Sequence, residues 1–300
     1  MKIVIAGSSG FLGTALRHSL AEQGHDITRL VRRPAGGPDE STWDPYAGTL
    51  DQSVIDTADV VVNLAGSPTA GNPHSRAWAR RLRESRVTTT GLLAEAIARS
   101  HAAGGNAAYL AGNGISYYGD HGDDVVREGS DSRGDALLTE VTRAWQAVAE
   151  PARDAGARVC ILRTSPVIDR GNPPLEQMLP LFKLGLGARL GDGRQYFPII
   201  SLRDWVGAVS HLAADDTSSG PFNLCCPVVP TNGEFTEALA DAVGRRARLA
   251  APAPVLKLAA GRMAPEILGS LRSEPAALQE AGYTFQDDGV RDVIAAALQA

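Results

Sequence analysis

Three glycines spaced G-x-x-G-x-x-G stand near the amino terminus, in the run Gly7-Ser8-Ser9-Gly10-Phe11-Leu12-Gly13. They follow an apolar stretch, residues 2–6, that predicts a buried strand, and they open a segment with the apolar spacing of a helix. Here the first glycine permits a tight turn, the second lets backbone approach a pyrophosphate, and the third allows close helix packing. Free N–H groups at the helix start attract the anion. The motif predicts a dinucleotide-binding loop; the alternative is a purely structural turn.

The end of the second predicted strand, residues 26–31, bears on which dinucleotide binds. NAD-specific proteins of this type usually place Asp or Glu there, to hold the ribose 2′-hydroxyl. This chain has Arg32 and Arg33 instead, and guanidinium groups bind phosphate in a bidentate manner. We therefore expect NADP(H) and regard NAD(H) as the less favoured cofactor. The alternative is a solvated basic loop, above all for Arg33.

Further polar and small residues follow the next strands, predicted at residues 59–66 and 107–111. Ligands of open α/β sheets bind at the carboxyl ends of strands. The first of these strands ends on small residues that would let the cofactor approach the backbone: Leu64, Ala65 and Gly66. The second precedes the candidates for proton transfer or substrate orientation: Asn113, Ser116, Tyr117, Tyr118 and His121. The alternatives are aromatic packing for the tyrosines, a turn for Asn113 and a solvated loop for His121.

Composition limits the class of protein. With 300 residues, 44% of them hydrophobic and 21% charged, the chain can bury a sizeable core. The net charge of -5 argues against a nucleic-acid or anionic-membrane surface. No apolar run approaches the roughly 20 residues that span a bilayer, and no signal peptide is recognisable. The three cysteines have no metal-ligand spacing. We expect a cytoplasmic protein with a small-molecule substrate and no metal, and leave a homodimer open.

The order of the predicted elements indicates the fold. Strands alternate with helices, the longest of these at residues 76–100 and 135–156, up to a strand at residues 158–163. This order is typical of a Rossmann-type, doubly wound parallel sheet of the α/β class. Beyond residue 165, proline and glycine become frequent and helices then dominate. We predict an NADP(H)-binding domain at 1–165 and a smaller, mainly helical substrate lobe at 166–300. The lobe is interleaved with the first domain, contributing an edge strand and helix from about 200–225.

Motifs spread over nearly the whole chain carry a resemblance to a known family. They are Gly7–Gly13, Trp43-Asp44-Pro45, Asn63–Gly66, Ser85-Arg86, Tyr117-Tyr118-Gly119-Asp120, Leu162-Arg163-Thr164, Met178-Leu179-Pro180, Gly191-Asp192-Gly193-Arg194-Gln195, Gly220-Pro221-Phe222-Asn223 and Glu280-Ala281-Gly282-Tyr283. On these residues the chain resembles the atypical, extended short-chain dehydrogenase/reductase proteins, in the SulA/YfcH-like branch of the NAD-dependent epimerase/dehydratase (sugar-nucleotide epimerase-like) family. The resemblance implies further cofactor contacts from Arg86, Ala111, Gly112, Arg163 and Ser165. Arg163 could instead pair with a carboxylate.

The catalytic pair that the superfamily ordinarily uses is missing. There a Tyr exchanges the substrate proton, and a Lys four residues later lowers the pKa of that Tyr. No tyrosine of this chain is followed by such a lysine. Alignment places Leu138 and Thr142 at the two positions, and Asn113 where a hydroxyl is usual. An amide can orient a carbonyl or an oxyanion but cannot titrate.

Three functions are therefore open. The first is an NADP(H)-dependent oxidoreductase or epimerase (an isomerase) acting on a small polar carbonyl or alcohol. The second is a non-redox enzyme on the same fold, for a cyclisation, dehydration or isomerisation. The third is a non-catalytic NADP(H)-binding sensor or interaction protein. In either enzyme, Arg189, Arg194 and Gln195 lie among glycines of the second lobe and could bind a polar substrate group; the alternative is a solvated turn.

Overall fold

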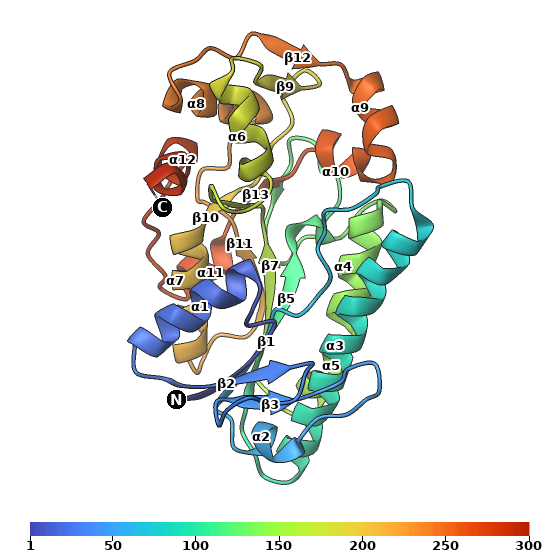
Figure 1. Ribbon diagram of the computed structural model, residues 1–300, viewed down its shortest axis with the longest axis vertical. Coiled ribbons are helices and arrows are strands. Elements are labelled where there is room, and N and C mark those ends of the chain that lie inside the picture. Colours follow the sequence, from blue (N-terminus) through green and yellow to red (C-terminus); the bar gives the residue numbers. More distant parts are fainter. Residues whose placement is uncertain (300) are drawn as a thin grey trace.

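A seven-stranded sheet forms the core of the computed structural model, which describes residues 1–299 (Figure 1). Its strands are β1 (Lys2–Ala6), β2 (Asp26–Val31), β3 (Glu40–Thr42), β4 (Val60–Asn63), β5 (Ala108–Gly114), β7 (Val159–Thr164) and β11 (Gly220–Leu224). They run parallel in the order β11-β7-β5-β4-β1-β2-β3. The order reverses between β1 and β4, as in a Rossmann-type sheet. The predicted fold class is confirmed.

Helices cover both faces of the sheet, so its central strands are apolar on both sides. One face carries α1 (Phe11–Glu22), α7 (Leu202–Ala214) and α11 (Ala276–Glu280); the other carries α2 (Gln52–Asp56), α3 (Arg76–Ala102), α4 (Leu137–Ala147) and α5 (Glu150–Asp154). Side chains of a strand alternate between faces. Thus Ile3 and Ile5 pack under α1 and α7, whereas Val4 packs under α3. The helix predicted at 135–156 is two helices, because Pro151 cannot continue one.

The second lobe stands above the carboxyl ends of the strands (Figure 1). Its core lies among α6 (Leu175–Lys183), α8 (Asn232–Ala242) and α12 (Val290–Gln299). Short parallel pairs are β8 (Val167–Ile168) with β10 (Ile200–Ser201), and β9 (Ala188–Leu190) with β12 (Leu249–Ala251). The strand β11 and helix α7 return to the first domain from this half of the chain. The domain boundaries themselves stay a prediction.

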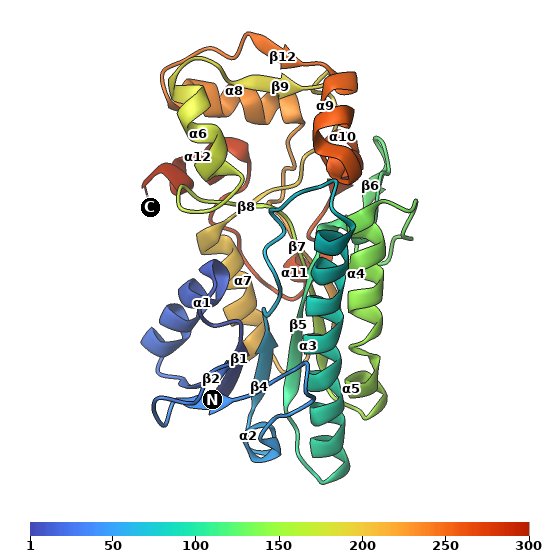
Figure 2. The same ribbon diagram turned by 45° about the vertical axis from the view of Figure 1, so that its right-hand side comes forward.

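A returning segment ties the lobe to the first domain. After α9 (Ala253–Ala260), η2 (Gly261–Met263) and α10 (Ala264–Leu268), the short strand β13 (Arg272–Ser273) pairs with β6 (Val125–Val126). Just before β13, the carbonyl of Ser270 accepts a hydrogen bond from the backbone N–H of His121 at 2.9 Å. The backbone N–H of Ser270 donates to the Asp120 carboxylate at 3.1 Å. These contacts hold α10 above the amino-terminal ends of α3 and α4 (Figure 2).

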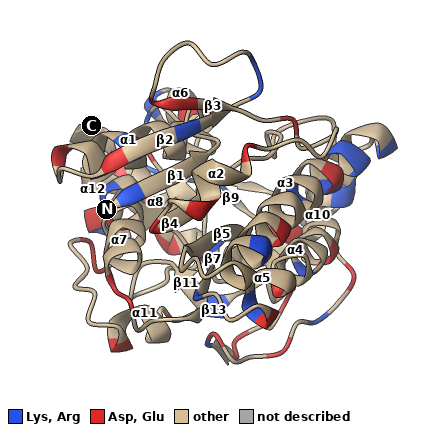
Figure 3. Cartoon of the chain, turned by 90° about the horizontal axis from the view of Figure 1, so that it is seen from below, with Lys and Arg blue, Asp and Glu red and all other residues tan. Residues whose placement is uncertain are grey.

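The chain has nearly as many basic residues as acidic ones, 29 against 34. Acidic and basic positions are interspersed over the elements seen from below, apart from a run of arginines early in α3 (Figure 3). Within residues 1–299, no helix combines the length and the apolar character needed to cross a membrane.

Candidate cofactor and substrate site

The glycine loop after β1 forms a tight backbone cradle in which a Cβ on Gly7 or Gly13 would collide with other backbone atoms. Gly7 has a φ of +82°, and a Cβ there would lie 2.6 Å from the carbonyl carbon of Leu64. A Cβ on Gly13 would lie 2.1 Å from the carbonyl oxygen of Gly7. Helix α1 starts after Gly10, which has no side chain to cap it. Its first N–H groups, including those of Phe11 and Leu12, therefore have no partner within the helix and fit an anion.

The other loop positions differ in exposure. Ser8 is buried, and its carbonyl accepts the Thr14 hydroxyl at 3.4 Å, whereas Ser9 is exposed. Phe11 and Leu12 are half-buried and pack against the core under α1. Of this group, Ser9 and the backbone of the loop are the most open to a ligand.

The ends of the neighbouring strands close around the same loop. The backbone N–H of Leu64 donates to the Ala6 carbonyl at 2.9 Å, and the backbone N–H of Ala65 donates to the Asn63 side-chain oxygen at 3.0 Å. A Cβ on Gly66 would approach the Arg86 side chain to 3.4 Å. The next strand lies deeper: Ala111 belongs to the core, and a Cβ on Gly112 would lie 2.7 Å from the Asn63 carbonyl oxygen. Both of these residues are packed inside the sheet.

Arg86 is a half-buried cation beside the segment that follows β4. Its guanidinium donates to the carbonyls of Ser67 and Leu82, each at 3.1 Å, and lies 5.1 Å from the Trp145 ring centre. Among the described residues no carboxylate pairs with it. Burial lowers its pKa to about 10. Because an unpaired buried charge is costly, this position fits an anionic ligand such as a phosphate.

The two arginines after β2 are in different environments. Both terminal guanidinium nitrogens of Arg33 donate to the buried carboxylate of Glu40, at 2.7 and 2.6 Å, and the Arg29 guanidinium forms an ion pair with the same carboxylate at 2.9 Å. The hydrogen bonds from Arg33 are the main reason that the pKa of Glu40 falls to about 2. Arg32 is exposed and makes no hydrogen bond or ion pair with the rest of residues 1–299. Arg33 is thus occupied within the protein, whereas Arg32 is available to a ligand.

Tyr118 is held in a buried network. Its hydroxyl donates to the Asn223 side chain at 2.7 Å and accepts from the Arg163 guanidinium at 2.6 Å. Burial raises the pKa of Tyr118 to about 12. Arg163 also donates to the Glu128 carbonyl at 3.0 Å and to Gln146. These contacts join the ends of β5, β7 and β11, so they favour a structural role for Tyr118 and Arg163 over contact with substrate or cofactor.

Tyr117 has a different environment from its neighbour. It is half-buried, with the Arg163 guanidinium 3.7 Å from its ring centre and the Tyr118 ring meeting it edge to face. Its hydroxyl makes no hydrogen bond within the described part of the chain. Tyr117 is therefore the tyrosine of the pair whose hydroxyl remains available.

The positions where the usual catalytic groups would stand hold side chains that do not titrate near neutral pH. The Asn113 amide donates to the Thr142 carbonyl at 3.2 Å and accepts the Gly114 N–H at 2.7 Å. The Thr142 hydroxyl donates to the Leu138 carbonyl at 2.8 Å, inside its own helix. The side chains of Asn113, Leu138 and Thr142 do not titrate near neutral pH, so the missing Tyr-Lys pair is not replaced at its own positions.

Buried polar atoms without partners mark the same end of the sheet. Buried polar groups are nearly always hydrogen-bonded, so each such atom calls for an explanation. The hydroxyl of Ser165, after β7, and Nε2 of the buried His121 have no partner within residues 1–299. Ser116 is half-buried in η1 (Ile115–Tyr117), directly after β5.

Beside Ser116 lies a carboxyl that the sequence did not single out, Glu266 of α10. Its Oε1 is buried and has no hydrogen-bond partner among the described residues. Burial raises its pKa, although the Ser116 hydroxyl and the Leu138 N–H interact with the carboxyl and oppose the shift. No local motif surrounds Glu266; it reaches this place because the second lobe folds back over α4.

The predicted substrate residues lie together in the second lobe, in β9 and the turn that follows it. Arg189 and Arg194 are exposed. Gln195 donates to the carbonyls of Leu190 at 3.0 Å and Ile267 at 3.4 Å, so it links its loop to α10. Substrate binding by the three residues stays a prediction.

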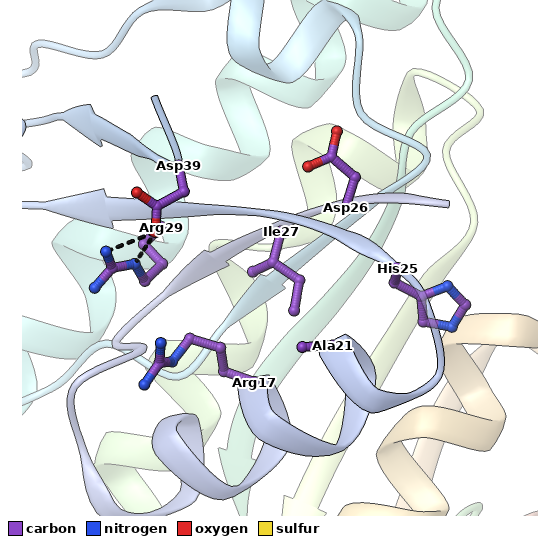
Figure 4. A pocket seen from close by; sticks show the side chains of 7 residues that line it. All are labelled: Arg17, Ala21, His25, Asp26, Ile27, Arg29 and Asp39. Carbon is purple, nitrogen blue, oxygen red and sulfur yellow. Dashed lines mark hydrogen bonds and ion pairs between the residues drawn. The ribbon is translucent and has the colours of Figure 1, made fainter. Parts of the chain in front are cut away.

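Two pockets lie away from this region. The first, of about 200 Å³, is lined by residues of α1 and β2 with Asp39, to which Arg29 is paired at 2.7 Å (Figure 4). It is smaller than the roughly 300 Å³ at which ligand sites begin. The second, of about 580 Å³, lies among α1, α7 and α12. Neither includes the glycine loop or the end of β5, so neither is the candidate site.

Comparison with known proteins agrees with this geometry. A profile of the NAD dependent epimerase/dehydratase family matches residues 3–225, and one for a domain of unknown function (DUF1731) matches residues 251–297. The chain is 39% identical over 293 residues to "Epimerase family protein Mb2239" of Mycobacterium bovis, covering 97% of this chain and 96% of that protein.

Two solved structures extend the comparison. The crystal structure of human epimerase family protein SDR39U1 (isoform 2) with NADPH superposes with a TM-score of 0.89 at 29% identity, covering 100% of both chains. The nucleoside-diphosphate sugar epimerase from Corynebacterium glutamicum superposes with a TM-score of 0.81 at 31% identity, covering 99% of this chain and 58% of the other.

Proposed function

Because the chain belongs to the NAD dependent epimerase/dehydratase family, we propose that it binds NADP(H) and transfers hydride to or from a small polar carbonyl or alcohol. The observation that carries the proposal is the cradle at Gly7–Gly13, together with Arg86, which has no carboxylate partner within residues 1–299 and lies beside Gly66 after the neighbouring strand β4. The backbone N–H groups of the loop and the Arg86 guanidinium would hold the phosphates.

The preference for the 2′-phosphate rests on Arg32. It follows β2, where NAD-specific proteins place a carboxylate. It is exposed and unpaired within residues 1–299, whereas Arg33 is occupied by Glu40. The human relative crystallised with NADPH supports the same choice.

The reaction would take place beyond β5 and β7. When bound, the nucleotide would supply or accept the hydride there. The chain's own contributions are the hydroxyls of Tyr117 and Ser165, unpartnered within residues 1–299, and the hydroxyl of Ser116, which lies beside Glu266; each can orient a carbonyl or hydroxyl oxygen. An oxidoreductase and an epimerase both require this arrangement.

Isotope transfer tests the proposal. NADPH carrying deuterium at C4, as each of its two stereoisomers, is incubated with the protein and a panel of small aldehydes, ketones and sugar-derived carbonyls. We expect deuterium from one stereoisomer alone to appear in an alcohol product. Tight NADPH binding without transfer to any member would contradict the redox proposal and favour a sensor. Product formation without isotope transfer would favour non-redox chemistry on this fold.

A further inference from the structure

One titratable group beside Ser116 has a buried carboxyl oxygen without a partner among the described residues. Glu266 lies on α10 of the second lobe, above the amino-terminal end of α4 (Figure 2). Its Oε1 is buried without a partner in the described structure, while the side chain as a whole is half-buried. Oε1 is thus shielded from water, while another part of the residue remains exposed.

The two groups that interact with this carboxyl define its place. One is the hydroxyl of Ser116, directly beyond β5, and the other is the backbone N–H of Leu138. Leu138 occupies the position at which the superfamily ordinarily has its proton-exchanging Tyr. Glu266 therefore lies, from the opposite lobe, beside the first turn of the helix that carries this position.

The surroundings keep the carboxyl without a counter-ion. The nearby elements carry Asp120 and His121 after η1, Glu140 in α4 and Arg262 in η2. None of these forms a hydrogen bond or ion pair with Glu266 among residues 1–299, and no charged side chain contributes to its pKa. The dominant influence is burial, which favours the protonated form. A carboxyl protonated closer to neutral pH is a suitable general acid and, after losing its proton, a suitable base.

We propose that Glu266 is the proton donor and acceptor of this enzyme, taking the place of the absent Tyr-Lys pair. The inference rests on the proposed NADP(H) function and deepens it. In carbonyl reduction the carbonyl carbon would gain the hydride that the nucleotide supplies when bound. The O–H bond of the Glu266 carboxyl breaks as the O–H bond of the product alcohol forms, and water then reprotonates the carboxylate. Alcohol oxidation is the reverse, with Glu266 taking the hydroxyl proton. Ser116 would orient the reacting oxygen between them.

Proton linkage tests the position of Glu266 without a substrate. NADP⁺ and NADPH share the 2′-phosphate, but the oxidised nicotinamide ring carries a positive charge. That charge would favour ionisation of a neighbouring carboxyl. Calorimetric titration in buffers of different ionisation enthalpy measures the protons released. At the pH where Glu266 is half ionised, we expect NADP⁺ to release about 0.4 proton more than NADPH, as follows from a pKa lowered by about one unit.

Two variants complete the experiment. Glu266→Gln keeps the shape and removes the ionisation, so the difference between NADP⁺ and NADPH should vanish. Glu140→Gln, the same change at an exposed position of α4, should leave the difference intact. Should Glu266→Gln fold poorly, carbon-13 NMR of the glutamate carboxyls in the unmutated protein gives the same titration directly.

The outcomes are separable. An equal proton release for both nucleotides, or a difference that survives in Glu266→Gln, would overturn the assignment of Glu266 while leaving NADP(H) binding intact. Failure of both nucleotides to bind would instead overturn the proposed function. With a substrate from the isotope screen, Glu266→Gln should lower kcat by about 10²-fold or more and remove the pH dependence of the rate that Glu266 causes.

Discussion

Replacing Tyr118 by phenylalanine should destabilise the protein without weakening cofactor binding. The Tyr118 hydroxyl is the donor to Asn223, whose side chain is fully buried, and it is also an acceptor from Arg163. In Tyr118→Phe the Asn223 oxygen loses its donor and has no access to water. Arg163 keeps its other bonds, to Glu128 and Gln146.

The size of the effect follows from that unpaired oxygen. Leaving a buried polar group unsatisfied costs about 1–3 kcal/mol. The unfolding entropy of a 300-residue chain is about 0.6 kcal/mol/K, from roughly 2 cal/mol/K per residue, so Tm should fall by about 2–5 °C. Tyr117→Phe is the matched control. The half-buried Tyr117 hydroxyl has no partner within residues 1–299, so the free energy of unfolding should change by less than about 0.5 kcal/mol.

Urea unfolding and calorimetric NADPH titration of both variants measure the two quantities. We expect Tyr118→Phe to lose stability and keep its NADPH affinity. A Tyr118→Phe protein as stable as the parent would refute the reasoning, because the buried network would then contribute nothing. Lost hydride transfer at unchanged stability would instead make Tyr118 a participant in the chemistry.

Three further predictions concern charged side chains. Arg32→Ala should weaken NADPH binding about 10–100-fold, because it removes charge-assisted hydrogen bonds worth about 1.5–3 kcal/mol, and should leave NADH binding unchanged. Arg33→Ala should chiefly lower the free energy of unfolding. Similar losses of NADPH affinity in both variants would contradict the assignment of Arg32 to the 2′-phosphate. Arg86→Met should weaken NADPH and NADH alike, by about tenfold or more in calorimetry, and an unchanged affinity would remove Arg86 from the phosphate site. The pKa of Glu266 is raised in the folded state, so the stability that its protonated form contributes is fully present below the unfolded-state pKa and is lost as pH rises through the folded-state pKa. Glu266→Gln should therefore have a higher Tm than the parent protein at pH 8 but not at pH 4. An equal gain in Tm at both pH values would contradict the raised pKa.

The parts of the fold that local sequence encodes were predictable. The strands expected at residues 2–6, 26–31 and 158–163 agree with β1, β2 and β7 within a residue. The glycine loop was recognisable because its function depends on backbone conformation at a fixed spacing. The short strand β3 was missed, since three residues among turns carry too little periodicity to indicate a strand.

The chemistry of the site depends more on contacts between distant residues. Nothing near Arg33 indicates that Glu40 would bind it, because that pairing requires β3 to lie beside β2. The network of Tyr118 joins residues up to 105 positions apart. Glu266 is brought to Ser116 by the return of the second lobe over α4. Such placements follow from tertiary packing, so single-sequence patterns could not reveal them.

Calorimetric titration of the cofactor-stripped protein with NADPH, and with NADH in parallel, tests the central claim most directly. We expect NADPH to bind at least ten times more tightly than NADH, a difference of about 1.4 kcal/mol. No binding of either nucleotide would contradict the account, and the cradle at Gly7–Gly13 would then be a structural turn without a cofactor.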